Sequence, residues 1–373
     1  YDPMFKLSVE RVPLDPTQDL VSAPTFSRLE HQVTRTDLYR LTQAFVDHFI
    51  ASYPEPPAAI VLDLDHTEDP THGQQEFTFY NHHYQSYCYL PLLIFEGTSH
   101  ALLAAFLRPG KRPPGAENAM ILVRLLAYLR RHWPTTHILV RGDSHFATPE
   151  VLAVIAHRRH MDFVFGLAGN PVLLRQAAPV MQEARRLFQQ RTAMAHAYGA
   201  PPPPSTRVYE EFAYAAASWE QPWRVIVKAE VMAAGDNPRF VVTSLEAPTP
   251  QHVYEDLYCA RGNCENDIKA VKHDRHSDRT SATTFLANAT RLLWACGAYV
   301  LHHALRTHTL AHTALATAQP STVILTLFKV ATQVKQYKDR ILLHLPTSCP
   351  VKALLHRVTT LLTAIPVPAL NTS

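Results

Sequence analysis

The chain has 373 residues, 47% of them hydrophobic, so it can bury one large core or two smaller ones. Its net charge of +3 is mildly basic, which permits a nucleic-acid partner without requiring one. Five scattered cysteines, with no secretory leader, argue against a disulfide framework. No apolar run approaches the ~20 residues that cross a bilayer. We therefore expect a soluble, cytoplasmic protein without a membrane partner.

The N-terminal part is rich in proline and holds one expected helix, at 35–52, which Pro54 ends. The chain begins with Tyr1 rather than Met, and nothing nearby resembles a cleavage site. We therefore expect that truncation has removed an earlier segment. Residues 1–57 are interpreted as a truncated N-terminal helical region.

The next part alternates between apolar runs of strand length and helical patterns. Two of its strands end in acids, at 59–65 and 137–143. The order β-β-β-α-β-α-β predicts an α/β fold, a mixed sheet flanked by helices. Strands are expected at 59–65, 77–93, 101–107, 137–143 and 162–167, and helices at 119–132 and 149–160.

The character of the sequence changes after Gly169. A helix-like arm and a stiff proline spacer lead to a small β unit, which a long helical region follows. A last β-like run and a helix close the chain. The expected segments are the arm at 172–194, the spacer at 201–204, the β unit at 207–245, the helical region at 258–312, the β-like run at 340–345 and the helix at 351–364.

Three acids stand at the exposed ends of expected elements: Asp65 and Asp143 after strands, and Glu265 on a later helix. Carboxylate oxygens suit hard cations such as Mg²⁺, and two ions ~3.5–4 Å apart serve phosphodiester chemistry. Acids after strands are also common as helix caps and turn residues. Asp63 shares a strand face with Asp65 because side chains alternate. We prefer Asp65, nearer the strand tip, and keep Asp63 as the alternative.

The segment that begins at Tyr258 places several polar side chains on one helix face. At about 100° per residue, Tyr258, Arg261, Glu265 and Lys272 fall within about 60°. One acid among cations suits a metal-binding carboxylate beside a phosphate backbone. It equally suits a solvated helix face, where pairs such as Glu265 with Lys269 contribute about 0.2–0.5 kcal/mol each. The spacing alone leaves both interpretations open.

Several motifs occur in a fixed order along the chain. They are Leu62-Asp-Leu-Asp65-His-Thr-Glu-Asp-Pro-Thr-His-Gly73, the tyrosine-rich run 84–91, Leu139-Val-Arg-Gly-Asp143-Ser-His-Phe146, the stripe from Tyr258 to Lys272, and 340–349. Together they resemble the DDE transposases of bacterial insertion sequences, most closely the insertion-sequence thirteen-eighty family. The stripe matches that superfamily's Y-(2)-R-(3)-E-(6)-K signature in type and spacing. The resemblance extends from about residue 24 to the end.

The resemblance implies an RNase H-like catalytic core interrupted by a β-strand insertion domain, with a helical C-terminal part. The three acids would bind Mg²⁺, with Mn²⁺ as a substitute, while Tyr258, Arg261 and Lys272 would hold DNA phosphates. By the family's cut-and-paste chemistry, hydrolysis at the element's end frees a 3′-hydroxyl that attacks target DNA. The implied partners are double-stranded DNA and a second copy in a homodimeric synaptic complex, in a nucleoid-associated bacterial protein.

The resemblance also implies a division of the chain. After residues 1–57, the first part of the core would span 58–168, a linker and β insertion 169–250, and the second part of the core with the C-terminal region 251–373. Family members carry a longer helical region before residue 24, so we hypothesise impaired binding of specific DNA ends. Two alternatives stay open: a structure-specific nuclease on the same scaffold, and a non-catalytic DNA-binding remnant.

Overall fold

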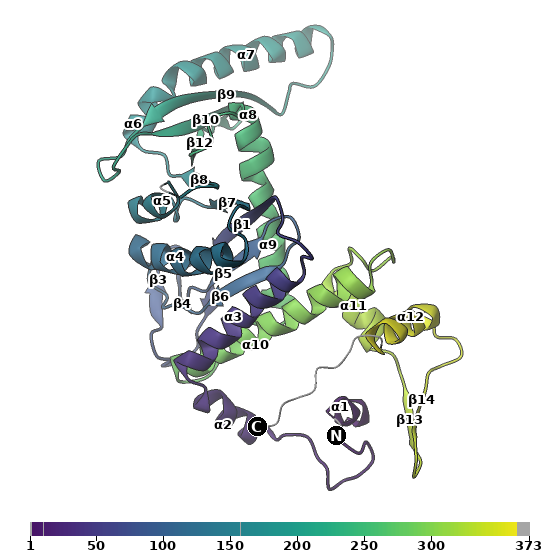
Figure 1. The fold of residues 1–373 in the computed structure, drawn as a ribbon. Coiled ribbons are helices and arrows are strands. Elements are labelled where there is room, and N and C mark those ends of the chain that lie inside the picture. The colour runs from purple at the N-terminus through teal and green to yellow at the C-terminus, as the bar shows by residue number, and fades with distance from the viewer. Residues whose placement is uncertain (1, 10, 157, 364–373) are drawn as a thin grey trace. The chain divides into compact units, whose positions relative to one another are not determined.

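The computed structural model describes residues 2–9, 11–156 and 158–363 (Figure 1). It divides into two compact units, one of residues 40–269 and one of residues 1–39 with 270–373. Tyr1 lies outside the described residues, as does Ala364 at the end of the last expected helix. Among the described helices, none combines the length and apolarity needed to span a bilayer.

A mixed sheet forms the centre of the 40–269 unit. In the described chain it has nine strands in the order β11-β10-β12-β8-β7-β1-β5-β6, with β9 paired to β10. β7 runs parallel to both β1 and β8, while β5 is antiparallel to β1. The expected mixed sheet is confirmed. Its strands are β1 (Ala59–His66), β5 (Leu92–Glu96), β6 (Leu102–Phe106), β7 (His137–Gly142), β8 (Met161–Leu167), β9 (Ser205–Tyr214), β10 (Trp223–Met232), β11 (Gly235–Asp236) and β12 (Arg239–Thr243).

The β unit expected at 207–245 extends this main sheet. β12 pairs antiparallel with β8, from Phe240 opposite Leu167 to Thr243 opposite Val164. The last four residues of β12 are all buried, and β10 and β8 pair with its two edges. Local periodicity could not show which strand that neighbour is, because β8 lies more than 70 residues earlier in the chain.

The single strand expected at 77–93 is wrong. The structure divides this run into β3 (Phe79–Asn81), β4 (Ser86–Tyr89) and the first part of β5. Gln85, with left-handed backbone at φ 55°, interrupts it, and Phe77 at its start also has left-handed backbone, at φ 59°. β3 and β4 form a small separate sheet with β2 (Asp69–Pro70), in the order β2-β4-β3.

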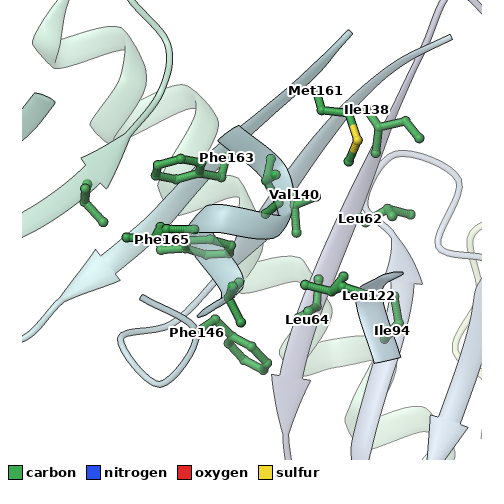
Figure 2. Close-up of a cluster of buried hydrophobic side chains, with 14 of the residues drawn as sticks. Leu62, Leu64, Ile94, Leu122, Ile138, Val140, Phe146, Met161, Phe163 and Phe165 are labelled. Carbon is green, nitrogen blue, oxygen red and sulfur yellow. The ribbon is translucent and has the colours of Figure 1, made fainter. Parts of the chain in front are cut away.

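One face of the main sheet packs on helices and forms the principal core. Alternating residues Leu62 and Leu64 of β1 point into it, on the same face as Phe163 and Phe165 of β8, whose rings stack at 5.4 Å (Figure 2). Each such side chain contributes about 1.5–3 kcal/mol when it is fully buried. The helices that cover this core are α3 (Arg35–Ala51), α4 (Gly115–His132), α5 (Pro149–Ala156), α6 (Pro171–Gln176) and α7 (Ala178–Ala197).

The opposite face is covered by the helical segment that carries the predicted stripe. Val253 and Tyr254 pack against Leu139, Val164 and other strand residues there. The segment is helical as expected, but its winding changes along its length. It comprises α8 (Pro250–His252), π-helical η1 (Val253–Tyr258), 3₁₀-helical η2 (Cys259–Arg261), α9 (Gly262–Lys269) and π-helical η3 (Ala270–Asp274).

The second unit is mainly helical. Its N-terminal part is tied to α10 by an ion pair of Glu30 with Arg291 and by an edge-to-face contact of Phe26 with Trp294. A separate apolar cluster holds Leu310, Val323 and Val358. Its elements are α1 (Pro3–Ser8), α2 (Ala23–Gln32), α10 (Phe285–Ala304), η4 (Leu305–Thr309), α11 (Pro320–Val323), η5 (Ile324–Phe328), β13 (Gln333–Gln336), β14 (Ile341–His344) and α12 (Lys352–Thr363).

Candidate active site

Asp65 and Asp143 lie side by side because of the strand register. β1 and β7 are parallel, and Leu64 is the partner of Gly142, so the next residue on each strand is an aspartate. Adjacent strands lie about 4.8 Å apart, which brings the two residues to the same edge of the sheet. Their charges act on each other, since Asp143 raises the pKa of Asp65. Asp65 and Asp143 are 78 residues apart in the sequence, so only the fold brings them together.

The Asp65 carboxylate is partly buried and has one cationic partner. Arg261 donates a hydrogen bond from Nη1 to Oδ2 at 2.8 Å, and the backbone NH of His66 donates to Oδ1 at 2.9 Å. Burial raises the pKa of Asp65 to about 6, the Arg261 charge opposes that rise, and the Asp143 charge adds to it. Two carboxylates held this close repel each other, and a bound cation offsets that repulsion.

Asp143 is held by the residue two places after it. His145 donates its backbone NH to Oδ1 at 2.9 Å, and its ring Nδ1 lies 2.8 Å from Oδ2. Burial opposes ionisation, but these bonds and the charge of His145 outweigh burial and lower the pKa of Asp143. The carboxylate therefore stays ionised and keeps a fixed orientation.

Asp63 has a different environment from Asp65. Its side chain is 1% exposed and accepts two hydrogen bonds from Arg141, both at 2.7 Å. Arg141 also donates to the carbonyl of Leu257 at 2.7 Å, so the pair joins β1 and β7 to η1. At Gly97, a Cβ would come within 2.5 Å of both partners, so only glycine fits beside them. This pairing leaves Asp65 as the accessible aspartate of β1.

Tyr258 and Arg261 reach the same edge of the sheet from the helical segment. The Arg261 guanidinium carbon lies 5.9 Å from the Tyr258 ring centroid. The Tyr258 hydroxyl packs against Gly166 of β8, where a Cβ would come within 2.6 Å of that oxygen. Burial raises the pKa of Tyr258, the charge of Arg261 opposes this, and the charge of Asp143 adds to it. In this structure Arg261 pairs with Asp65.

The expectation of one regular helix face is wrong. The segment passes from π to 3₁₀ to α and back to π winding, so 100° per residue does not hold from Tyr258 to Lys272. Lys272 lies in η3, which belongs to the other compact unit. Val253 and Tyr254 of η1 are buried against the sheet, and the directions of the later side chains follow the observed winding instead of a regular helix.

Glu265 lies apart from the two aspartates. It is exposed on α9, and its side chain makes no hydrogen bond or ion pair within the described chain. Cys264 and Ile268 are the buried residues of α9, and Asp267 bonds to the His100 ring at 2.9 Å. Across the described residues no three His, Cys, Asp or Glu side chains form a group able to hold a metal ion. The structure thus brings together two of the three predicted acids.

Comparison with known proteins places the chain in a family. The family described as transposase DDE domain group 1 has a model that matches residues 1–367. The chain belongs to that transposase family. No curated protein matches it. A solved cryo-EM structure of the piggyBac transposase synaptic complex with hairpin DNA is similar at a TM-score of 0.40 and 10% identity, over 95% of this chain and 67% of that one. A similarity this distant carries no argument about the site.

Three further residues at this candidate site were not predicted from the sequence. The His66 ring stacks on Phe146 at 4.6 Å, lies 5.6 Å from the His145 ring, and contacts the buried guanidinium of Arg108 through Nδ1. His66 directly follows Asp65 and His145 lies two residues after Asp143, and this proximity in sequence was the available signal. Arg108 had none, because its role depends on the fold.

Asp65 and Asp143 are the candidate ligands for a divalent ion. Asp65 and Asp143 supply adjacent carboxylate oxygens at one sheet edge, and their mutual repulsion is what a hard cation relieves. Arg261 now neutralises part of that charge. These two carboxylates therefore fit a divalent ion, and a complete site needs further oxygen ligands from Glu265, water or DNA.

Proposed function

We propose that this chain is a DNA transposase of a bacterial insertion sequence, related to the insertion-sequence thirteen-eighty family, that cuts and joins DNA by cut-and-paste chemistry. One observation carries the proposal. The parallel register of β1 and β7 sets Asp65 and Asp143 together at one sheet edge, in a chain of the DDE transposase family. In this proposal the sheet and its helices are an RNase H-like core, with the strands of 205–243 as its insertion.

The proposed division of the chain follows from that core. Residues 58–168 would supply the two aspartates, 169–250 a linker and β insertion, and 251–373 the helix with Glu265 and the C-terminal region. Residues 1–57 would precede the core. The protein would act as a homodimer on two DNA ends, in the nucleoid.

In the proposed mechanism, Asp65, Asp143 and Glu265 would hold Mg²⁺, or Mn²⁺ in its place. A divalent cation supplies charge neutralisation at the scissile phosphate. The protein's own contribution is positioning: the sheet edge fixes the two aspartates, and His145 orients Asp143.

Tyr258, Arg261 and Lys272 would hold phosphates of the DNA end. Arg261 would then exchange its bond to Asp65 for one to a phosphate, because both acceptors are anionic oxygens. That exchange would free the carboxylate as the DNA arrives.

One assay tests the proposal. Protein, labelled DNA carrying the element's ends, and a target plasmid are incubated with Mg²⁺ or Mn²⁺. Joined product supports the transposase, whereas cut ends without joining identify a nuclease on the same scaffold. DNA binding without cleavage by wild-type protein identifies a non-catalytic remnant.

Single substitutions test which of the predicted acids take part in cleavage. Asp143→Asn and Glu265→Gln should each abolish cleavage while leaving most DNA binding, and Glu246→Gln, another exposed acid, should leave both unchanged. Cleavage retained by Glu265→Gln would remove Glu265 from the proposed metal site.

A further inference from the structure

A two-stranded ribbon near the C-terminus stands as a sheet of its own. β13 and β14 pair antiparallel, from Gln333 opposite His344 to Gln336 opposite Ile341 (Figure 1). The backbone NH of Tyr337 donates to the Arg340 carbonyl at 2.8 Å and closes the turn. This ribbon is separate from the candidate active site and lies in the other compact unit.

The two faces of the ribbon differ in chemistry. Side chains alternate along a strand, and opposite partners share a face. One face, here called the polar face, carries Gln333, Lys335, Leu342 and His344. At the turn the Arg340 guanidinium carbon lies 5.4 Å from the Tyr337 ring centroid. The other face, here called the aliphatic face, carries Val334, Gln336, Ile341 and Leu343.

Positive charge gathers in this short segment. Residues 329–344 hold four Lys or Arg side chains and one acid, Asp339, so their formal net charge is +3, as large as that of the whole chain. Lys335, Lys338, Arg340 and His344 are all exposed. The remaining 357 residues are therefore neutral in sum, and the ribbon is one of several exposed basic segments of the chain.

The ribbon is also exposed along most of its length. Of the residues of β13 and β14, only Val334 and Leu342 are partly buried. An isolated two-stranded ribbon is at best marginally stable in water, and its open edges invite a partner. Its cationic and amide side chains favour a polyanion, and the major groove of B-DNA is wide enough to admit a two-stranded ribbon.

We propose that the polar face of the β13–β14 ribbon binds duplex DNA. Lys335 and Arg340 contact phosphates or guanine edges in the groove, and Gln333 is placed to contact an adenine edge. This inference rests on the proposed function and adds to it a DNA contact outside the active site. It also assigns a DNA-binding role to the C-terminal part of the chain.

The test compares matched double variants. Binding of a ~30-base-pair duplex with and without the element's end is followed by fluorescence anisotropy across a salt series, for wild type, Lys335→Ala/Arg340→Ala and Arg124→Ala/Arg131→Ala. The second pair is exposed on α4 and removes the same charge. The ribbon variant should bind at least about tenfold more weakly. Its slope of log affinity against log salt should fall by about 2, because each phosphate contact contributes about 0.9.

Several outcomes would overturn the proposal. One is unchanged affinity in the ribbon variant while wild type binds, and another is an equal loss in the α4 control. A third is unchanged DNA affinity together with a Leu343→Ser variant of altered oligomeric mass, which would make the ribbon a self-association surface. Melting temperatures of ribbon variant and wild type should agree, because exposed substitutions change stability by about 0.5 kcal/mol or less.

Different experimental results would refute the proposed function and the DNA-binding role of the ribbon. Wild-type protein that binds duplex but never cuts or joins it would overturn the transposase and leave the ribbon standing. Wild-type protein that joins DNA, with a ribbon variant of equal affinity, would overturn the ribbon alone.

Discussion

Replacing Asp63 by alanine should unfold the protein more readily without acting on chemistry directly. Asp63 and Arg141 are 1% and 5% exposed, and two hydrogen bonds of 2.7 Å join them. Removing one partner from a buried ion pair leaves a buried unpaired charge, which costs about 3–5 kcal/mol. A unit of 150–250 residues loses about 2–4 °C of melting temperature per kcal/mol. We therefore expect a fall of about 6–20 °C.

The assay is thermal and urea denaturation of wild type, Asp63→Ala, Asp65→Ala and the double variant Asp63→Leu/Arg141→Met. Asp65 is 14% exposed, so its removal should cost less stability than removal of Asp63. The double variant replaces both charges by apolar groups and should lose less than Asp63→Ala alone. Its remaining loss comes from the Leu257 carbonyl, which no longer receives a hydrogen bond.

Two results would refute this reasoning. Equal midpoints for Asp63→Ala and wild type would show that the pair is not buried as described. A folded Asp63→Ala protein that binds DNA normally but cannot cleave it, beside an active Asp65→Ala protein, would exchange the roles of the two aspartates.

Three further predictions concern stability. Gly166→Ala should lower it by about 1–3 kcal/mol, because the new Cβ would meet the Tyr258 hydroxyl at 2.6 Å; an unchanged urea midpoint would contradict that contact. Burial would raise the pKa of Glu230, but hydrogen bonds from Arg207, Lys228 and Asn237 outweigh burial and lower it to about 2. The stability that the ionised Glu230 contributes is therefore present above about pH 4.5 and is lost as the pH falls toward 2. Glu230→Gln should therefore cost up to about 3 kcal/mol at pH 7, and the difference from wild type should shrink below pH 4.5 in urea titrations. Burial, and then the charges of nearby arginines, lower the pKa of His302 to about 4, so the free energy of unfolding should fall as the pH drops from about 6.5 to 4. His302→Leu should remove this dependence of stability on pH. The same pH dependence in His302→Leu and wild type would contradict the prediction.

Local patterns were sufficient for much of the fold. Apolar runs ending in acids predicted strands at 59–65 and 137–143, each within one residue of β1 (Ala59–His66) and β7 (His137–Gly142). Pro134 placed the end of α4 close to its observed end at His132, since proline breaks a helix. The prediction of one strand at 77–93 failed because the left-handed residue that interrupts it, Gln85, is not a glycine.

What the sequence by itself determined is the strongly patterned elements, such as β1, β7 and α4, and the residue types at their ends, because these follow from local periodicity. Tertiary structure alone decided which aspartate of β1 is accessible, since Arg141 lies 78 residues away and pairs with Asp63. It also decided that Arg261, 196 residues from Asp65, reaches that carboxylate, while Glu265 four residues later lies exposed on α9. Such choices depend on strand register and on helix winding under packing, and neither is encoded in spacing along the chain.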